Sequence, residues 1–170
     1  MACLLTTGRK VPCKSAFGGI KTVFMADFPV VATIGTDNII TAFTDTPVWF
    51  QFDVKGNSSL ETSITSSRDN GTTFYTQTLN LTLTYLDNAT KNEIQLIAVA
   101  RPTIVVEDYY GNQFLCGYEN GMEVTGGTIV TGAAAGDLSG FTLVMEGMEE
   151  TAPYFVVPAI TGDSEQITPN

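Results

Sequence analysis

The most constraining feature of the sequence is a regular alternation in residues 72–86, TTFYTQTLNLTLTYL. Leu79, Leu81, Leu83 and Tyr85 alternate with threonine and asparagine, which places apolar and polar side chains on opposite faces of an extended strand. Threonine is β-branched, so it favours a strand without adding charge. The segment therefore predicts a long β-strand with one face on a core and the other face polar and uncharged.

Other segments have the alternation or the turn boundaries of strands. In residues 48–54, VWFQFDV, the two valines and two phenylalanines fall on one face and Trp49 falls on the other. Residues 55–72 are rich in serine and threonine and are predicted to be a long loop with a short strand near 60–65. The remaining predicted strands are 19–28, 39–43, 103–108, 114–119, 122–131, 141–149 and the YFVV segment after Pro153.

One segment has a helical period instead. Thr90 and Glu93 have the spacing of a capping box, in which each side chain accepts a hydrogen bond from the other residue's backbone N–H. Apolar residues follow at helical spacing, and Pro102 ends the pattern. These signals predict a helix at about residues 90–100. The predicted fold class is therefore mainly β, a sandwich or barrel with one flanking α-helix.

The length of 170 residues fits one domain. We expect an N-terminal arm at residues 1–19, a single β-rich domain at residues 20–157 and a C-terminal tail at residues 158–170. No apolar run is long enough to span a bilayer, so the sequence predicts no membrane anchor.

Charge is sparse and unevenly placed along the chain. Charged residues make up only 15% of the sequence, and the net charge is −10. Residues 57–170 contain fourteen acidic and three basic residues, which accounts for −11. An acidic body does not bind nucleic acid by neutralising phosphates. It suits a surface that nucleic acid passes without sticking.

The residue types needed for most catalytic designs are missing. The chain contains no histidine, which removes Ser-His and Cys-His nucleophile pairs and histidine-based zinc sites. Cys3, Cys13 and Cys116 form no CxxC pair and leave an odd cysteine, so neither a disulfide framework nor a metal site is predicted. We expect a protein that is not an enzyme and that uses no cofactor or metal.

A glycine-rich stretch at residues 123–140, EVTGGTIVTGAAAGDLSG, raises the question of a phosphate loop. It contains no lysine, and no helical pattern follows it, so neither a P-loop nor a dinucleotide fingerprint fits. A hairpin with a loop of small residues is the better interpretation. Gly126 and Gly127 inside its first strand indicate a bulge or the close approach of another backbone.

The order of these elements resembles bacteriophage virion structural proteins, and most closely the tail tube protein family. Three stretches show the resemblance: SSLETSITSSRDNGTTFYTQTLNLTL, ARPTIVVEDYYGNQFLCGYENGMEVTGGTIVTG and GDLSGFTLVMEGMEE, within residues 57–150. The resemblance implies a subunit that forms rings, commonly hexameric, whose strands join around a channel. The rings would stack into a tube that conducts DNA. It further implies assembly in the bacterial cytoplasm, a place in the virion tail, and contacts with other tail proteins.

Carried onto this chain, the resemblance assigns contacts between subunits and a channel face. The hairpin 122–149 would help to form the ring, with Gly126, Gly127, Ala133, Ala134 and Ala135 giving room to a neighbour. The arm and the loop 55–72 would contact adjacent rings, and the loop residues concerned are Asn57, Ser58, Ser59, Arg68 and Asp69. The candidates for an acidic channel face are Glu107, Asp108, Glu123 and Glu146.

Two alternatives stay open at the level of sequence. The chain has the β-rich, assembly-dependent character of a phage head decoration or head-completion protein. It also contains acidic residues, Glu107, Asp108 and Glu146, that a carbohydrate-binding module or a carboxylate-based glycan hydrolase would use.

Overall fold

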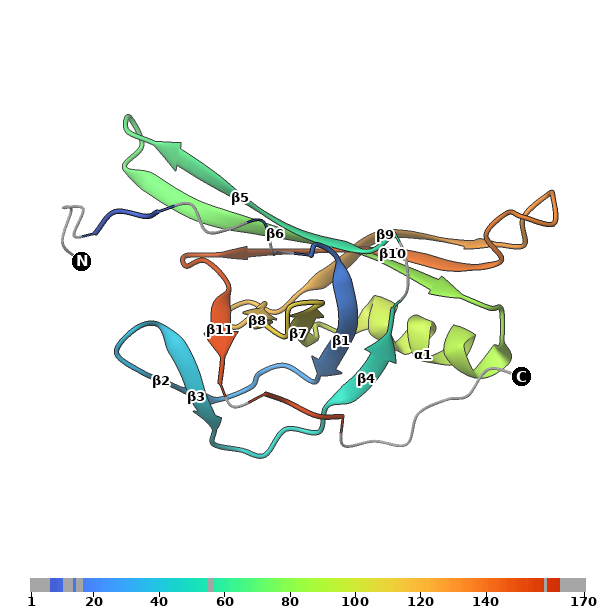
Figure 1. Ribbon diagram of the computed structural model, residues 1–170, viewed down its shortest axis with the longest axis horizontal. Coiled ribbons are helices and arrows are strands. Elements are labelled where there is room, and N and C mark those ends of the chain that lie inside the picture. Colours follow the sequence, from blue (N-terminus) through green and yellow to red (C-terminus); the bar gives the residue numbers. More distant parts are fainter. Residues whose placement is uncertain (1–6, 11–13, 15–16, 55–56, 158, 163–170) are drawn as a thin grey trace.

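A computed structural model of the chain describes residues 7–10, 14, 17–54, 57–157 and 159–162. Within these residues the chain forms eleven strands and one helix (Figure 1). In chain order they are β1 (Ile20–Ala26), β2 (Ala32–Ile34), β3 (Ile39–Phe43), β4 (Phe50–Asp53), β5 (Ser59–Ser67), β6 (Thr72–Thr84), α1 (Asn88–Val99), β7 (Thr103–Asp108), β8 (Gln113–Cys116), β9 (Glu123–Val130), β10 (Gly140–Glu149) and β11 (Tyr154–Val156). The predicted arm and tail lie largely outside the described residues, as do Cys3 and Cys13.

The strands form two sheets. A seven-stranded sheet has the order β2-β3-β11-β8-β7-β1-β4, and a four-stranded sheet has the order β5-β6-β10-β9. All pairs in the four-stranded sheet are antiparallel, so its edge strands β5 and β9 run in opposite directions. In Figure 1 this sheet lies along the top of the molecule, with α1 and the seven-stranded sheet beneath it. The prediction of a mainly β sandwich with one flanking helix is confirmed.

The seven-stranded sheet is buried on both faces at its centre. Along β1, Val23 and Met25 belong to the core between the two sheets, whereas Phe24 and Ala26 belong to a second core on the far face. The alternation of side chains in a strand assigns neighbouring residues to the two cores. Burial on both faces explains the unbroken apolar runs at residues 23–26 of β1 and 104–106 of β7.

The long strand predicted at 72–86 is β6, which ends at Thr84. Leu79, Leu81 and Leu83 are buried in the core between the sheets, as the alternation predicts. The β5–β6 and β9–β10 hairpins extend past the body of the molecule at opposite ends (Figure 1).

The helix begins earlier than predicted, and its cap is a different residue. Asp87 is the N-cap, and its Oδ1 accepts a hydrogen bond from the Thr90 backbone N–H at 2.7 Å. The Thr90 hydroxyl donates to Asp87 Oδ2 at 2.6 Å. Thr90 is therefore a donor inside the first turn, so the predicted capping box with Glu93 is wrong. These bonds, chiefly that from the Thr90 hydroxyl, lower the pKa of the Asp87 carboxyl.

One further prediction needs correction. The serine- and threonine-rich stretch is mostly strand β5, because pairing with β6 satisfies its backbone along nine residues. In residues 48–54 the predicted alternation is confirmed, since Phe52 and Val54 pack in the core between the sheets and Trp49 packs in the second core. Trp49 packs edge-to-face on Phe43 in the second core, where the larger ring gains more from burial.

The single described helix has 12 residues. Across the described part of the chain, no helix is both long and apolar enough to cross a membrane.

Candidate functional site

The outer face of the four-stranded sheet is mostly polar, with Phe74, Val144 and Met148 as apolar residues among its hydroxyl and carboxylate groups. Residues that alternate with the core-facing leucines of β6 point away from the seven-stranded sheet, and the register extends this face across β5, β10 and β9. We call these outward side chains the free face. Serine and threonine dominate it, and none of its side chains is buried. An uncovered face on a twisted antiparallel sheet is available to solvent or to a ligand.

Three carboxylates form a row across the free face. Glu61 on β5 lies opposite Thr78 on β6, Thr78 lies opposite Glu146 on β10, and Glu146 lies opposite Glu123 on β9. The structure thus brings together two of the four predicted channel residues, Glu123 and Glu146. It adds Glu61, which lies in the short strand predicted near residues 60–65 but was not predicted as a channel residue.

The electrostatics of the row are repulsive. Glu123 and Glu146 are direct cross-strand neighbours, and like charges in that position destabilise a sheet. The guanidinium of Arg101 lies at the rim, with Nε 3.0 Å from Glu123 Oε1, and offsets part of this repulsion. The four strands themselves are fully described and contain no lysine or arginine. The free face therefore presents carboxylates and hydroxyls to anything that approaches it.

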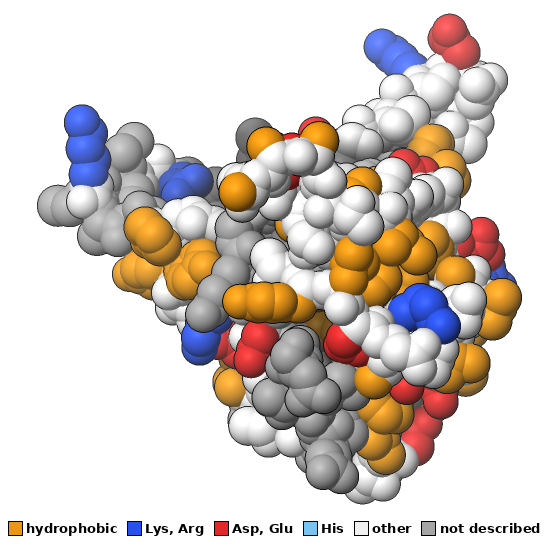
Figure 2. Space-filling view, turned by 90° about the vertical axis from the view of Figure 1, so that its right-hand side faces the viewer, with side chains coloured by type: hydrophobic (Ala, Val, Ile, Leu, Met, Phe, Trp, Pro, Cys, Tyr) orange, Lys and Arg blue, Asp and Glu red, His pale blue; other side chains and the backbone are white. Residues whose placement is uncertain are grey.

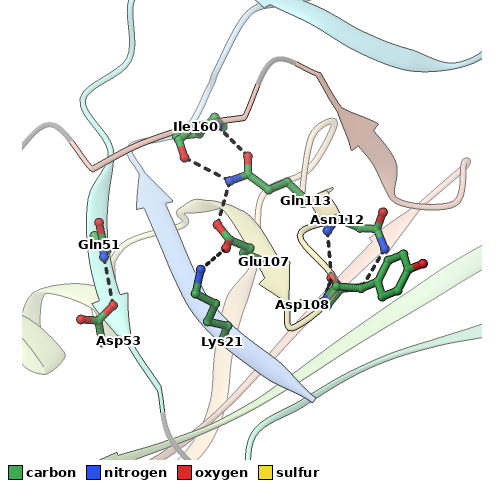
Figure 3. Close-up of polar contacts among 9 residues, drawn as sticks. Lys21, Gln51, Asp53, Glu107, Asp108, Asn112, Gln113 and Ile160 are labelled. Carbon is green, nitrogen blue, oxygen red and sulfur yellow. Dashed lines mark hydrogen bonds and ion pairs between the residues drawn. The ribbon is translucent and has the colours of Figure 1, made fainter. Parts of the chain in front are cut away.

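The other two predicted channel residues lie elsewhere. Glu107 is on β7 of the seven-stranded sheet, where it pairs with Lys21 at 2.7 Å and accepts a hydrogen bond from Gln113 at 3.1 Å (Figure 3). Asp108 closes the following turn by accepting bonds from the Asn112 backbone and side chain. Glu107 has the same strand parity as Val105 of the second core, so the whole sandwich separates it from Glu146. The carboxylates named for a glycan-cleaving site are therefore not brought together.

The predicted contact residues at the start of β5 are used within the chain. The buried hydroxyl of Ser58 accepts a hydrogen bond from the Thr82 backbone at 3.0 Å. The Asn57 carbonyl accepts one from the Thr82 hydroxyl at 3.1 Å, and the Ser59 hydroxyl accepts one from Asn80 at 3.5 Å. These bonds fix β5 on β6.

Arg68 and Asp69 lie in the turn at the tip of the projecting β5–β6 hairpin, and both are exposed. A contact from this tip to another subunit stays a prediction.

The two adjacent glycines of β9 differ in their surroundings. The register shifts where Val144 and Met145 of β10 face β9, which confirms the predicted bulge. A Cβ at Gly126 would meet no atom within 4 Å, whereas a Cβ at Gly127 would lie 2.6 Å from the Thr142 carbonyl oxygen. Gly127 thus makes room for β10 of its own chain, and only Gly126 leaves outward space for a neighbour.

The loop of small residues is closed by its own carboxylate. The backbone N–H groups of Ala133 and Ala134 donate to Asp137 Oδ2 at 2.9 and 2.8 Å. These bonds, chiefly that from Ala134, lower the pKa of the Asp137 carboxyl. The backbone groups that a phosphate would need are therefore occupied, in agreement with the absence of a P-loop motif. Ala133, Ala134 and Ala135 are all exposed.

Buried polar side chains join the four-stranded sheet to the sheet below it. Gln77 of β6 accepts a hydrogen bond from the Gly117 backbone at 3.0 Å. Glu149 of β10 accepts bonds from the Glu119 and Asn120 backbones at 2.9 and 3.1 Å, and burial raises the pKa of this carboxyl. Such satisfied buried groups fix one arrangement of the two sheets, so the free face is a rigid platform.

Both edges of the four-stranded sheet are open, although the bulge in β9 is one device that discourages pairing with another chain. β5 and β9 each pair with one neighbour only, over nine and eight residues. Each contains a single charged residue, Glu61 or Glu123, and neither contains lysine or proline. Natural proteins place such residues on edge strands to prevent pairing with another chain. Long edges without them are suited to joining a second copy.

Comparison of the chain with models of protein families, with curated proteins and with solved structures finds no match. Within the described ranges, no group of three or more cysteine, aspartate or glutamate side chains is placed to hold a metal ion. The site consists of a surface rich in carboxylates and hydroxyls, with an open strand edge on each side.

Proposed function

We propose that the protein is a structural subunit of a phage tail tube, in which the free face lines a channel for DNA. The observation that supports this most is the carboxylate row Glu61–Glu146–Glu123 on an uncovered sheet that contains no basic residue. A duplex carries one negative charge per about 1.7 Å of its axis, so such a wall repels it and lets it slide.

The arrangement of the edges supports ring formation. β5 and β9 are different surfaces of one subunit, so pairing β5 of one copy with β9 of the next is a head-to-tail contact, which closes into a ring or continues as a filament. Because the two edges run in opposite directions, rotating one copy about an axis along the strands makes this pairing antiparallel, the more stable type of ladder. In a closed ring the free faces form one continuous wall.

Blocking one edge at a time tests this contact. Ser63→Lys places a charge on β5 and Thr125→Lys places one on β9, and both positions are exposed. We expect wild-type chain to form rings or tubes in electron micrographs and each variant alone to stay monomeric. An equimolar mixture should give a dimer, since each variant keeps one open edge, and nothing larger.

The other outcomes are equally informative. A two-fold contact between identical edges predicts that one of the variants dimerises by itself, which would contradict head-to-tail assembly. A wild-type chain that stays monomeric but binds to expanded phage capsids would instead favour a head decoration protein. Far-ultraviolet circular dichroism and thermal melts check that both variants are folded.

A further inference from the structure

An apolar groove opens at the β9 edge of the four-stranded sheet, on the side that faces away from the free face. Its volume is about 350 Å³. Ile94 and Ala98 of α1 form one wall, and Val124, Gly127 and Ile129 of β9 line the other. The groove lies at the end of the molecule that Figure 2 shows, where hydrophobic side chains reach the surface in several separate groups.

The row of inward side chains on β9 is interrupted at Gly127. On β9, Val124, Gly127 and Ile129 face inward, opposite Met145, Leu143 and Phe141 of β10. Gly127 adds no side chain between the two branched ones, because the Thr142 carbonyl oxygen lies where its Cβ would be. Ile129 remains 62% exposed although it faces the core side. An aliphatic group from outside the chain would complete this part of the core.

The opposite edge of the same sheet presents such a group. Ile64 of β5 lies opposite Tyr75, two residues along β6 from Gln77 and on the same inward parity as the buried Leu79. It faces the core side of the sheet, yet it is 66% exposed because β5 continues beyond the body of the molecule. The edge that is predicted to pair with β9 thus contains an exposed aliphatic side chain on the correct face.

When β5 of one copy pairs with β9 of the next, Ile64 lies at the same height along the strands as the groove. Antiparallel pairing that starts at the Val130 end of β9 sets Ser59 beside Val130 and Ser63 beside Gly126, and all four of these residues belong to the free-face parity of their strands. The bulge of β9 follows at Thr125. Ile64 then lies beside the stretch from Val124 to Gly127. Because a continuous sheet keeps its faces across the joint, Ile64 enters on the groove side and not on the free face.

We propose that Ile64 of one copy fills the groove between α1 and β9 of the next copy. This inference rests on the proposed pairing of β5 with β9. It makes the joint a hydrophobic contact as well as a backbone ladder. It also explains why an isoleucine on the core side of an edge strand is exposed in the single chain.

Substitution tests the energetic part of the proposal. Ile64→Ser should raise the concentration needed for assembly by about tenfold or more, since it removes most of a buried aliphatic side chain. Val99→Ser is the matched control, because Val99 is a β-branched aliphatic residue, 86% exposed on α1, and does not line the groove. Both variants should melt within about 2 °C of wild type as monomers, as expected for exposed positions.

Cross-linking tests the geometry directly. One protein has Ile64→Cys and a second has Ala98→Cys, both in a background in which Cys3 and Cys13 are serine and the buried Cys116 is retained. Within one chain, Ile64 is on β5 and Ala98 is on α1 beside β9. β5 and β9 are themselves three strand spacings apart, about 14 Å, which is too far for a disulfide. Mixed and oxidised under assembly conditions, the two proteins should form a disulfide-linked heterodimer.

The outcomes separate the inference from the function on which it rests. Tubes that form from the mixture without cross-linking, together with equal assembly of Ile64→Ser and Val99→Ser, would overturn the seating of Ile64 and leave the tail tube proposal standing. A wild-type chain that stays monomeric at every salt and protein concentration would overturn both.

Discussion

The two sheets of this protein differ in how many of their faces are buried. The seven-stranded sheet is buried on both faces at its centre, where β1 and β7 have the apolar runs 23–26 and 104–106. The four-stranded sheet is buried on one face only, keeps a polar free face, and ends in two open edges. The first sheet holds the fold together. The second is stable where it touches the first, and its remaining surface is free for assembly.

This difference shows how a single strand can contribute both to stability and to a surface for assembly. On β6, adjacent residues divide between the core and the free face, so stability and surface chemistry are set by alternate positions. Substitutions at neighbouring positions should therefore separate the two roles.

The largest effect is expected for Leu79→Ala, because Leu79 is fully buried between the sheets. Loss of its side chain should lower the free energy of unfolding by about 3 kcal/mol. The neighbouring substitution Thr78→Ala, on the free face, should change it by less than about 0.5 kcal/mol. Urea denaturation of the two monomeric variants measures the difference. Equal losses would mean that the free face is structural as well.

The glycine pair gives the next effect. A Cβ at position 127 clashes with the β10 backbone, so Gly127→Ala should destabilise the monomer by about 1–3 kcal/mol. Gly126→Ala has open space and should leave the melting temperature almost unchanged. Calorimetry on both proteins decides this. If Gly127→Ala melts like wild type, the explanation of the groove by backbone crowding at this position is wrong.

Charge reversal on the free face should change how the protein meets DNA. In the triple variant Glu61→Lys, Glu123→Lys and Glu146→Lys, binding to a duplex should rise at least about tenfold at low salt and weaken steeply as salt is added. The control Asp37→Lys, Asp45→Lys and Glu93→Lys alters the net charge equally but lies off this sheet. Fluorescence anisotropy measures both. Equal binding by the two variants would assign the effect to net charge alone.

The smallest effect concerns pH and the cap of α1. The lowered pKa of Asp87 means that its contribution is present above the unfolded pKa of about 3.9 and is lost as pH falls through the lowered value. In the variant Asp87→Asn, the asparagine side chain caps a helix about as well but does not titrate. Wild type should therefore be more stable than this variant at about pH 6, and the difference between their melting temperatures should decrease as the pH is lowered to about 3. A constant difference would show that the carboxylate charge has no part in the cap.

The sequence was sufficient for the fold class because its strongest signals are local. The alternation in β6 predicted both its faces, and β7 was predicted with its observed bounds. The candidate site was harder, because its carboxylates are neighbours only through the register of four strands. Glu61 was missed, although it lies in the short strand predicted near residues 60–65, because the pairing with β6 that sets it in the row is a long-range property. Glu107 and Asp108 were wrongly predicted to belong to the channel face, because the sequence does not show on which sheet an acidic residue lies.

The central claim is that the free face lines a channel in the assembled protein, and the accessibility of Thr78 tests it most directly. Thr78 lies in the carboxylate row, so Thr78→Cys, with Cys3 and Cys13 changed to serine, places one thiol at the centre of that face. We expect a small maleimide to label it in monomers and in tubes, and a maleimide on a bulky polymer to label it only in monomers. Asp45→Cys, off this sheet, is the control for access of the polymer. If the bulky reagent labels position 78 as fast in tubes as in monomers, the free face is outside the tube and the account is wrong.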